Sequence, residues 1–120
     1  MPTVSPPWPT EIRLTKAKDE LIVTFDDGKS FELAAEMLRV MSPSAEVQGH
    51  SPEQRVLVGG KKTVKITAAQ PVGNYAVRLQ FDDGHNTGLF TWGYLHKLGT
   101  GRIALWSAYL EELKAAGKSR

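Results

Sequence analysis

The segment from Tyr75 to Gly99 constrains the fold more than any other part of the chain. In its first part every second residue is apolar and would point to the same side of a strand. These residues are Tyr75, Val77, Leu79 and Phe81. This two-residue period is typical of a strand with one buried face. The Asp-Asp-Gly sequence at 82–84 favours a tight turn, so we expect the chain to reverse into a second strand near residues 86–91. His85 leaves this turn beside two carboxylates.

A short helix should follow that second strand. Thr91 is a residue type that caps helix N-termini, and the apolar residues after it fall on one side of a helix, at Trp92, Leu95 and Leu98. Gly99 stands where a left-handed glycine commonly ends a helix. His96 falls on the other side, where a surface or hydrogen-bonded structural role is expected.

The first half of the chain shows the same order of elements. A strand over residues 21–25 leads into the turn at 26–29, a strand around 31–33, and helix formers over 34–41 that Ser42-Pro43 ends. The sequences VTFDDGKSFELAAEML and LQFDDGHNTGLFTWGYL thus share the order strand, turn, strand, helix. Two interpretations remain open: the chain contains two related halves, or Asp-Gly simply suits hairpins.

Two further segments are predicted outside these units. Residues 56–58 and 64–68 should pair as a hairpin around Gly59-Gly60. Residues 102–116 should form an amphipathic helix that covers the sheet. The apolar stripe of this helix is predicted to be Ile103, Trp106, Leu110 and Leu113.

These patterns predict a small single α+β domain of antiparallel β-hairpins packed with two or three short helices. Its parts are an extended proline-rich arm over 1–10, a folded domain over 11–99, and a C-terminal amphipathic helix and tail over 100–120. One core should collect the inward-facing residues, which are Val23, Phe25, Val77, Leu79, Phe81, Trp92, Leu95, Trp106 and Leu110.

Composition excludes several classes of protein. The chain has no cysteine, hence no disulfide, thiolate metal site or cysteine nucleophile, and a reducing cytoplasm is the default location. No apolar run approaches the roughly 18 residues that span a bilayer, so membrane insertion is excluded. A membrane-surface role of the helix at 102–116 is opposed by Glu111 and Glu112, so no membrane partner is expected. The net charge of +2 is too small to indicate nucleic acid, and no aromatic and basic binding motif accompanies it.

Sequence patterns of known catalytic sites are missing as well. No glycine-rich phosphate loop, nucleophile elbow or zincin motif occurs. The histidines His50, His85 and His96 are isolated from one another, and only His85 lies in an acidic turn. We therefore assign no catalytic residue and no cofactor.

Three separated segments, LRVMSPSAEVQGH (38–50), PVGNYAVRLQFDDGH (71–85) and TGLFTWGYLHKLG (87–99), resemble the gamma-butyrobetaine-hydroxylase-like N-terminal domain family, also called domain of unknown function 971. The similarity covers residues 10–99, with the segments in the family's order. The resemblance implies a small module, which binds zinc in members fused to 2-oxoglutarate-dependent dioxygenases. Other members stand alone in bacteria or are attached to P-loop carriers implicated in iron–sulfur cluster assembly.

The zinc ligands of the family are not carried over to this chain. In the zinc-binding members a CPCxxC pattern follows the helix, and the histidine of the DGH turn is the fourth ligand. The corresponding positions here are Ser42, Pro43, Ser44 and Val47, with only His85 kept. Serine hydroxyls are poor zinc ligands and valine is none, so we expect folding without a metal ion. No histidine begins an H-x-D/E pattern, so no dioxygenase iron centre is expected either.

The polar residues at this place form the candidate binding site. The family fold would bring two segments together, and their polar residues are Arg39, Ser42, Ser44, Glu46, Gln48, His50, Asp82, Asp83 and His85. The simpler interpretation is that Ser42 and Ser44 hydrogen-bond the loop that zinc holds in relatives. The alternative is a surface for a ligand or a partner.

The sequence favours a non-enzymatic binding or accessory module. The resemblance implies a link to iron–sulfur or redox metabolism, so the expected partner is a protein of that class. The competing hypothesis is a metal-binding protein or a small enzyme that uses His85 with nearby carboxylates.

Overall fold

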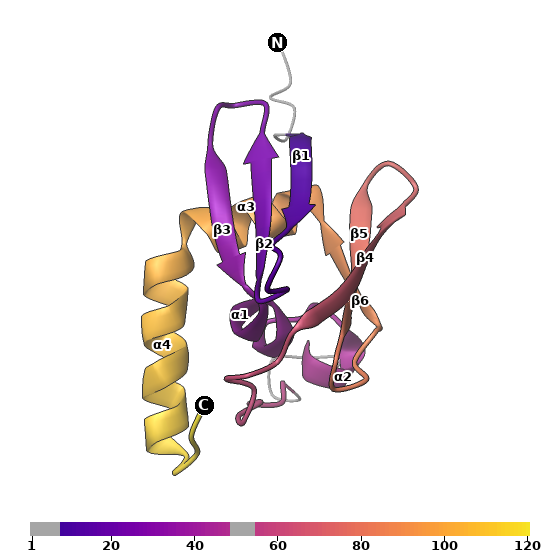
Figure 1. Cartoon of the computed structure of the whole chain (residues 1–120). Helices are drawn as coiled ribbons and strands as arrows, with labels where there is room; N and C mark the ends of the chain where they lie inside the picture. Colours follow the sequence, from indigo (N-terminus) through magenta and orange to yellow (C-terminus); the bar gives the residue numbers. More distant parts are fainter. Residues whose placement is uncertain (1–7, 49–54) are drawn as a thin grey trace.

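The computed structural model describes residues 8–48 and 55–120 as two three-stranded antiparallel sheets with helices (Figure 1). The first sheet has the order β1-β2-β3, and the second has the order β4-β5-β6. The strands are β1 (Pro9–Leu14), β2 (Glu20–Phe25), β3 (Ser30–Ala34), β4 (Ile66–Val72), β5 (Ala76–Phe81) and β6 (Gly88–Thr91). The predicted α+β class is confirmed.

Each sheet is followed by a helix, and a longer helix ends the fold. These elements are α1 (Ala35–Val40), the single-turn α2 (Ala45–Gln48), α3 (Trp92–Thr100) and α4 (Arg102–Ala115). Figure 1 shows α3 behind the first sheet and α4 alongside β3 and α1. The predicted cap of α3 is confirmed, because Thr91 Oγ1 accepts a hydrogen bond from the Tyr94 backbone N–H at 3.2 Å. In the described part of the chain, no helix has the length and apolar character needed to cross a bilayer.

The main core lies between the two sheets, α1 and α3. The predicted core residues that are buried there are Val23, Phe25, Val77, Leu79, Phe81 and Leu95. Trp92 and Trp106 are partly buried against this cluster. A second, smaller cluster joins α1 to α4 through Val40, Tyr109 and Leu113. The predicted core is therefore confirmed at the residues of the main core, but it fails at Leu110, which is 38% exposed, and the second cluster was not predicted.

Helix α4 buries a different face from the one predicted. Ile103 and Leu110 are 80% and 38% exposed, so the predicted stripe was wrong at these two positions. Tyr109 is buried instead, and its hydroxyl donates to the Val58 carbonyl at 2.6 Å. A buried tyrosine needs a partner for its O–H, and the loop at Val58 supplies one. Leu113 is buried as predicted.

Two predictions that relied on glycines were wrong, because tertiary contacts determine the structure at both places. Residues 56–58 are not a strand, and β4 pairs with β5. The Gly60 backbone N–H donates instead to the Ser119 carbonyl at 2.9 Å, so the C-terminal tail takes the place of a hairpin partner. Gly99 lies inside α3 and does not end it. A Cβ atom at Gly99 would lie 2.3 Å from the Phe31 ring, so close packing explains this glycine.

The two halves of the chain repeat the same backbone features. Each sheet is a meander of three strands, and each first strand is irregular at the same place, between Pro9 and Glu11 in β1 and between Ile66 and Ala68 in β4. The threonine at each irregularity donates its hydroxyl to a carbonyl of the middle strand at 3.2 Å. The halves therefore share a β-bulge as well as a strand order.

The two Asp-Asp-Gly turns also match. Gly28 and Gly84 have φ values of +85° and +92°, a backbone region that favours glycine. The second aspartate of each turn accepts from the backbone N–H two residues later, at 3.0 Å in the first half and 3.1 Å in the second. The first aspartate accepts from the backbone N–H that precedes the first strand of its sheet, at 3.1 Å in both halves.

The helix of each half reaches the turn of the other half. Arg39 in α1 donates Nε to Asp83 Oδ2 at 2.7 Å. At the same position in α3, His96 Nε2 lies 2.8 Å from Asp27 Oδ2. A preference of Asp-Gly for hairpins accounts for the turns but not for the bulges or this reciprocal contact. Of the two interpretations of the sequence, the structure supports a repeated unit.

Candidate functional site

A buried cluster of Ser42, Ser44 and His85, hereafter the His85 cluster, lies where the loop after α1 meets the turn between β5 and β6. The three residues are 0%, 7% and 5% exposed. His85 Nε2 lies 2.9 Å from Ser42 Oγ and 3.4 Å from Ser44 Oγ. The two segments that the sequence predicted to meet are therefore in contact through their polar side chains.

The loop that carries the serines is held by its own hydrogen bonds. Ser42 Oγ accepts from the Ser44 backbone N–H at 3.4 Å, and Gln48 Nε2 donates to the Ser42 carbonyl at 3.0 Å. The Ser44 carbonyl accepts from the backbone N–H of Gln48 at 2.9 Å. These hydrogen bonds hold the short helix α2 against the serines.

A glycine opposite the loop makes the close contact possible. A Cβ atom at Gly88 would lie 2.4 Å from Ser42 Oγ, which is shorter than any real contact of this kind. The equivalent contact in the first half places the Phe31 ring against Gly99. The repeat therefore contains the same close contact between a strand and a helix end twice. Only the contact at Gly88 is made with polar side chains.

The outer edge of the site is an ion-pair cluster centred on Asp83. Asp83 Oδ2 lies 2.7 Å from Arg39 Nε and 2.6 Å from Lys61 Nζ, and Oδ1 accepts from the His85 backbone N–H at 3.1 Å. Partial burial raises the pKa of Asp83, but the hydrogen bonds from Lys61, the His85 N–H and Arg39 outweigh it and lower the pKa to about 2. The carboxylate thus remains charged at neutral pH.

The structure brings together most of the predicted site residues in the described segments. Arg39, Ser42, Ser44, Asp83 and His85 meet in two layers, a buried layer of serines and histidine and an outer layer of charges. Gln48 joins them through its hydrogen bond to the Ser42 carbonyl, whereas Asp82 does not. Asp82 Oδ1 faces the backbone N–H of Lys65 at 3.1 Å, while the Glu46 side chain and His50 lie outside the described residues.

Sequence reasoning missed two contributors to the site, Lys61 and Gly88. The Lys61 ammonium reaches Asp83 from the loop before β4, and no local pattern joins these two positions. Gly88 was placed in a strand, where a glycine signals a close approach of another group. That signal was present in the sequence, but it did not reveal the partner.

The described residues of the His85 cluster do not supply the parts of a hydrolase. A serine hydroxyl at 2.9 Å from an imidazole nitrogen matches the distance of a nucleophile and its base. Ser42 is fully buried, however, so no substrate carbonyl can reach its Oγ. The carboxylate of Asp83 contacts the backbone N–H of His85, which is not the ring contact that orients a catalytic histidine.

The residues at this site do not fit the zinc ion that the resemblance implies. Two serine hydroxyls converge on His85 Nε2, the nitrogen nearest the loop, and Val47 adds a buried side chain without a donor atom. A tetrahedral zinc site takes nitrogen, thiolate or carboxylate ligands, and this set offers one nitrogen. Across residues 8–48 and 55–120, no group of three His, Cys, Asp or Glu residues is placed to hold a metal ion.

Comparison with known proteins identifies relatives of the whole chain. The family model described as "Gamma-butyrobetaine hydroxylase-like, N-terminal" matches residues 12–96. A protein solved by solution NMR is 50% identical with a TM-score of 0.83, over 97% of this chain and 91% of that chain. A second NMR structure is 48% identical with a TM-score of 0.83, over 100% of this chain and 89% of that chain.

A crystal structure of a protein with unknown function in the DUF971 family, from Acidithiobacillus ferrooxidans ATCC 23270, is also similar. It is 42% identical with a TM-score of 0.63, over 76% of this chain and 91% of that chain. No curated protein matches the chain. These matches confirm the resemblance inferred from the three sequence segments.

Proposed function

Since the chain belongs to the gamma-butyrobetaine hydroxylase-like N-terminal family, we propose that it is a non-enzymatic accessory module that binds a protein partner. The binding surface is the His85 turn surface, which we define as Lys61, Asp82, Asp83 and Asn86. One observation carries the proposal. The His85 cluster is closed and buried, so its histidine serves packing and hydrogen bonding, while Asp82 and Asn86 outside it are exposed and Asp83 is partly exposed.

The charges of this surface suit recognition of a protein. Asp83 is held in place by Arg39, Lys61 and a backbone N–H, so it loses little freedom when a partner binds. Asp82 and Asn86 are exposed on the same turn. The family resemblance supports a partner from iron–sulfur or redox metabolism, acting in the cytoplasm, and the modest net charge of +2 argues against nucleic acid.

The repeat supplies a matched control for testing this surface. Asp26 occupies in the first half the position that Asp82 occupies in the second, with the same hydrogen bond from a backbone N–H. We expect affinity capture followed by mass spectrometry to recover an iron–sulfur or redox protein with the wild-type chain and with Asp26→Lys. Asp82→Lys should lose that protein, and calorimetry with the purified partner should show the same order.

Metal analysis of the purified chain separates this proposal from the metal-binding or enzymatic alternative. The proposal requires less than one bound metal ion in ten protein molecules. A stoichiometric transition metal that disappears in His85→Ala would establish the alternative. Equal loss of the partner in Asp26→Lys and Asp82→Lys would show that the His85 turn is not the binding surface.

A further inference from the structure

A buried carboxylate in α1 is held by an arginine of the C-terminal tail. The Glu36 side chain is 6% exposed. Arg120 donates Nε to Oε2 at 3.0 Å and Nη2 to Oε1 at 2.7 Å. The Arg120 guanidinium also lies 5.4 Å from the centre of the Trp106 ring. The guanidinium thus makes two hydrogen bonds to one carboxylate and lies against an aromatic ring. Together the carboxylate and the ring form a site that is specific for arginine.

The two partners of this ion pair differ in how firmly they are fixed. Glu36 lies on a core helix and is almost fully buried, whereas the Arg120 side chain is 42% exposed. The tail is held mainly by hydrogen bonds, such as those from Gly60 N–H to Ser119 and from Lys118 Nζ to Leu57. A buried carboxylate needs a cation beside it. Glu36 therefore needs a cationic partner, but that cation need not come from Arg120.

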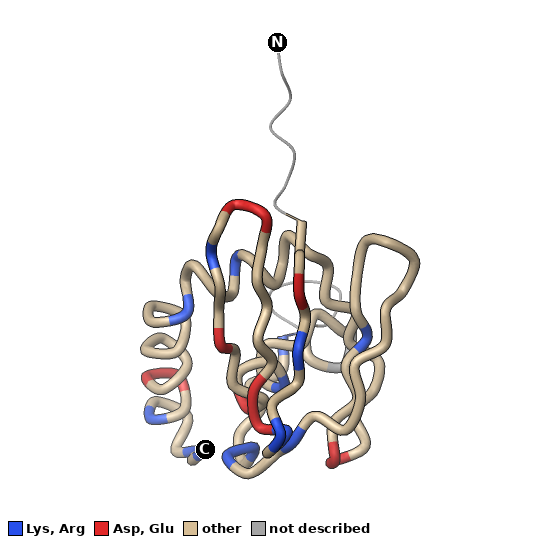
Figure 2. Tube along the Cα trace, turned by 45° about the horizontal axis from the view of Figure 1, so that its top comes forward, with Lys and Arg blue, Asp and Glu red and all other residues tan. Residues whose placement is uncertain are grey.

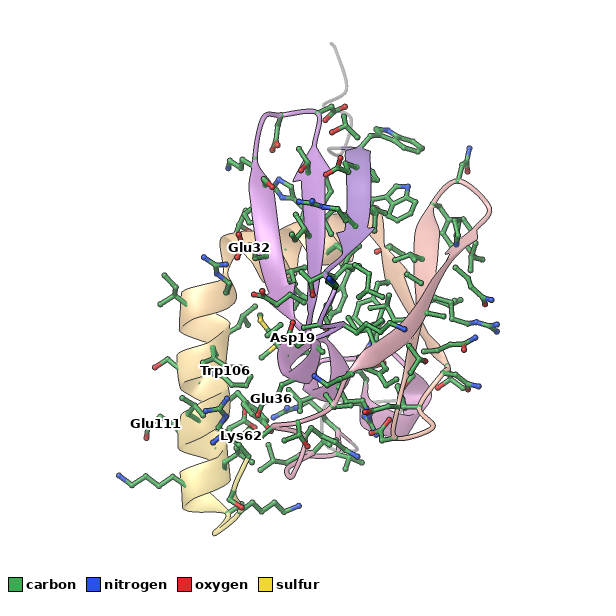
Figure 3. All side chains as sticks on the ribbon, in the orientation of Figure 1. Asp19, Glu32, Glu36, Lys62, Trp106 and Glu111 are labelled. Carbon is green, nitrogen blue, oxygen red and sulfur yellow. The ribbon has the colours of Figure 1, made fainter. Side chains whose placement is uncertain are left out.

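A groove of about 490 Å³ lies beside the pair, between β3, α1 and α4. Met37, Trp106 and Leu110 give it an apolar lining, and Ile103, 80% exposed, lies at its edge. Glu32 and Arg102 also line the groove, and the Arg102 guanidinium donates to the Glu32 carbonyl at 3.1 Å. Figure 3 shows Glu36 and Trp106 in the space between α1 and α4, with Glu32 farther along β3. Exposed apolar side chains beside acidic groups suit a segment that is both apolar and basic.

We propose that this groove binds an arginine-containing segment of a partner protein, whose guanidinium replaces that of Arg120 on Glu36 and Trp106. Apolar residues next to that arginine pack on Ile103 and Leu110, and Glu32 adds complementary charge. Arg120 is then an internal competitor, which lowers the apparent affinity for the partner. The groove shares no residue with the His85 turn surface, so this inference does not depend on the function proposed for that surface.

Figure 2 marks where charged residues lie along the chain: acidic residues on β3 and α1, and basic residues at the start of α4, in the 61–65 loop and in the tail. A negatively charged segment would meet the Glu36 carboxylate at the centre of the groove. When Arg120 is displaced, Glu32 and Glu36 remain in the lining against Arg102, so the groove then favours a cationic side chain.

The test uses the peptide acetyl-Arg-Leu-Leu-amide and the same peptide with citrulline, which is isosteric with arginine but uncharged. Binding is followed by the NMR shift of the Trp106 indole N–H. Arg120→Ala should bind the arginine peptide about tenfold more tightly than the wild type, because the competitor is gone. The citrulline peptide should show no saturable shift. Glu36→Gln combined with Arg120→Ala should abolish binding of the arginine peptide.

Thermal unfolding gives a second readout if Arg120→Ala is unstable. Leaving Glu36 unpaired lowers the midpoint of this variant, and the arginine peptide should raise it again in proportion to its concentration. The citrulline peptide should not. Ile103→Ser changes an exposed residue, so it should fold normally and weaken peptide binding severalfold in the Arg120→Ala background.

Three results would overturn the proposal. Equal binding of the arginine and citrulline peptides would show that Glu36 does not select a cation. Unchanged affinity in Arg120→Ala would show that Arg120 does not compete for the groove. Concentration-dependent dimers of the wild type that vanish in Arg120→Ala, seen by sedimentation, would show that the occupant is the tail of a second copy.

Discussion

Replacement of Gly99 by alanine tests the packing of α3 on the first sheet. A Cβ atom at this position would lie 2.3 Å from the Phe31 ring, whereas carbon atoms in good contact lie about 3.5–4.0 Å apart. The ring cannot swing away freely, because its centre is 5.6 Å from the His96 ring and 6.0 Å from the Phe25 ring. The helix or the strand must therefore move by about 1 Å or more.

The expected cost follows from two opposing effects. Inserting a methyl group into a packed core costs about 1–3 kcal/mol. Alanine is favoured over glycine inside a helix by up to about 1 kcal/mol, which offsets part of that cost. Gly99→Ala should thus lower the free energy of unfolding by about 1–2 kcal/mol. Urea unfolding followed by tryptophan fluorescence measures this change directly.

Helix α3 contains its own control for this experiment. A Cβ atom at Gly93 would have no neighbour within 4 Å, so Gly93→Ala should be neutral or stabilising by up to about 1 kcal/mol. In a Phe31→Ala background the clash is removed, and Gly99→Ala should become neutral or stabilising as well. If Gly99→Ala is as stable as the wild type, or if Phe31→Ala leaves its cost unchanged, the close contact of α3 with β3 is refuted.

Three further predictions address the core, the ion-pair cluster and the metal. Phe81→Ala should cost about 3–5 kcal/mol in urea unfolding, because Phe81 is 3% exposed, and a loss below about 1 kcal/mol would contradict its place in the core. The folded pKa of Asp83, about 2, lies below its ordinary value of 3.8, so its contribution is present above about pH 4 and is lost as pH falls toward 2. With allowance for solvent screening this amounts to about 1–2 kcal/mol, and an acid-unfolding profile left unchanged by Asp83→Asn would refute it. Thermal unfolding curves with and without a strong chelator should superimpose, since the binding energy of a structural metal would appear as folding energy, and a large drop after chelation would overturn the apo interpretation.

Local signals in the sequence predicted the parts of the fold that depend on local chemistry. Alternating apolar residues and the Asp-Asp-Gly turns located β2, β3 and β5, and Thr91 located the start of α3. These elements could be predicted because the conformational preferences of neighbouring residues favour the same backbone conformation as the final fold. The predicted meeting of Ser42 with His85 came from the family resemblance, since nothing local joins residues so far apart in sequence.

The errors arose where one pattern fits two structures. The spacing of Ile103, Trp106 and Leu110 marks one face of a helix, and that of Trp106, Tyr109 and Leu113 marks a neighbouring face equally well. The carbonyl of Val58 decides between them by accepting the Tyr109 hydroxyl, and no sequence window contains that pairing. Likewise the sequence does not distinguish a glycine that ends a helix from a glycine against which a phenyl ring packs.

The repeated unit explains why the polar site occurs once although its scaffold occurs twice. In both halves a helix end lies against the last strand of the other half's sheet, and each contact can hold only one bulky partner. Where β3 meets α3, the Phe31 ring takes the space and Gly99 stands on the helix of the second half. Where β6 meets the loop after α1, Gly88 stands on the strand and Ser42 takes the space. The Ser42 hydroxyl is buried there, so it needs a hydrogen-bonding partner. His85, from the adjacent turn, is that partner, and the equivalent position in the first half is Lys29, so the polar site needs this histidine as well as the exchange of small and large residues.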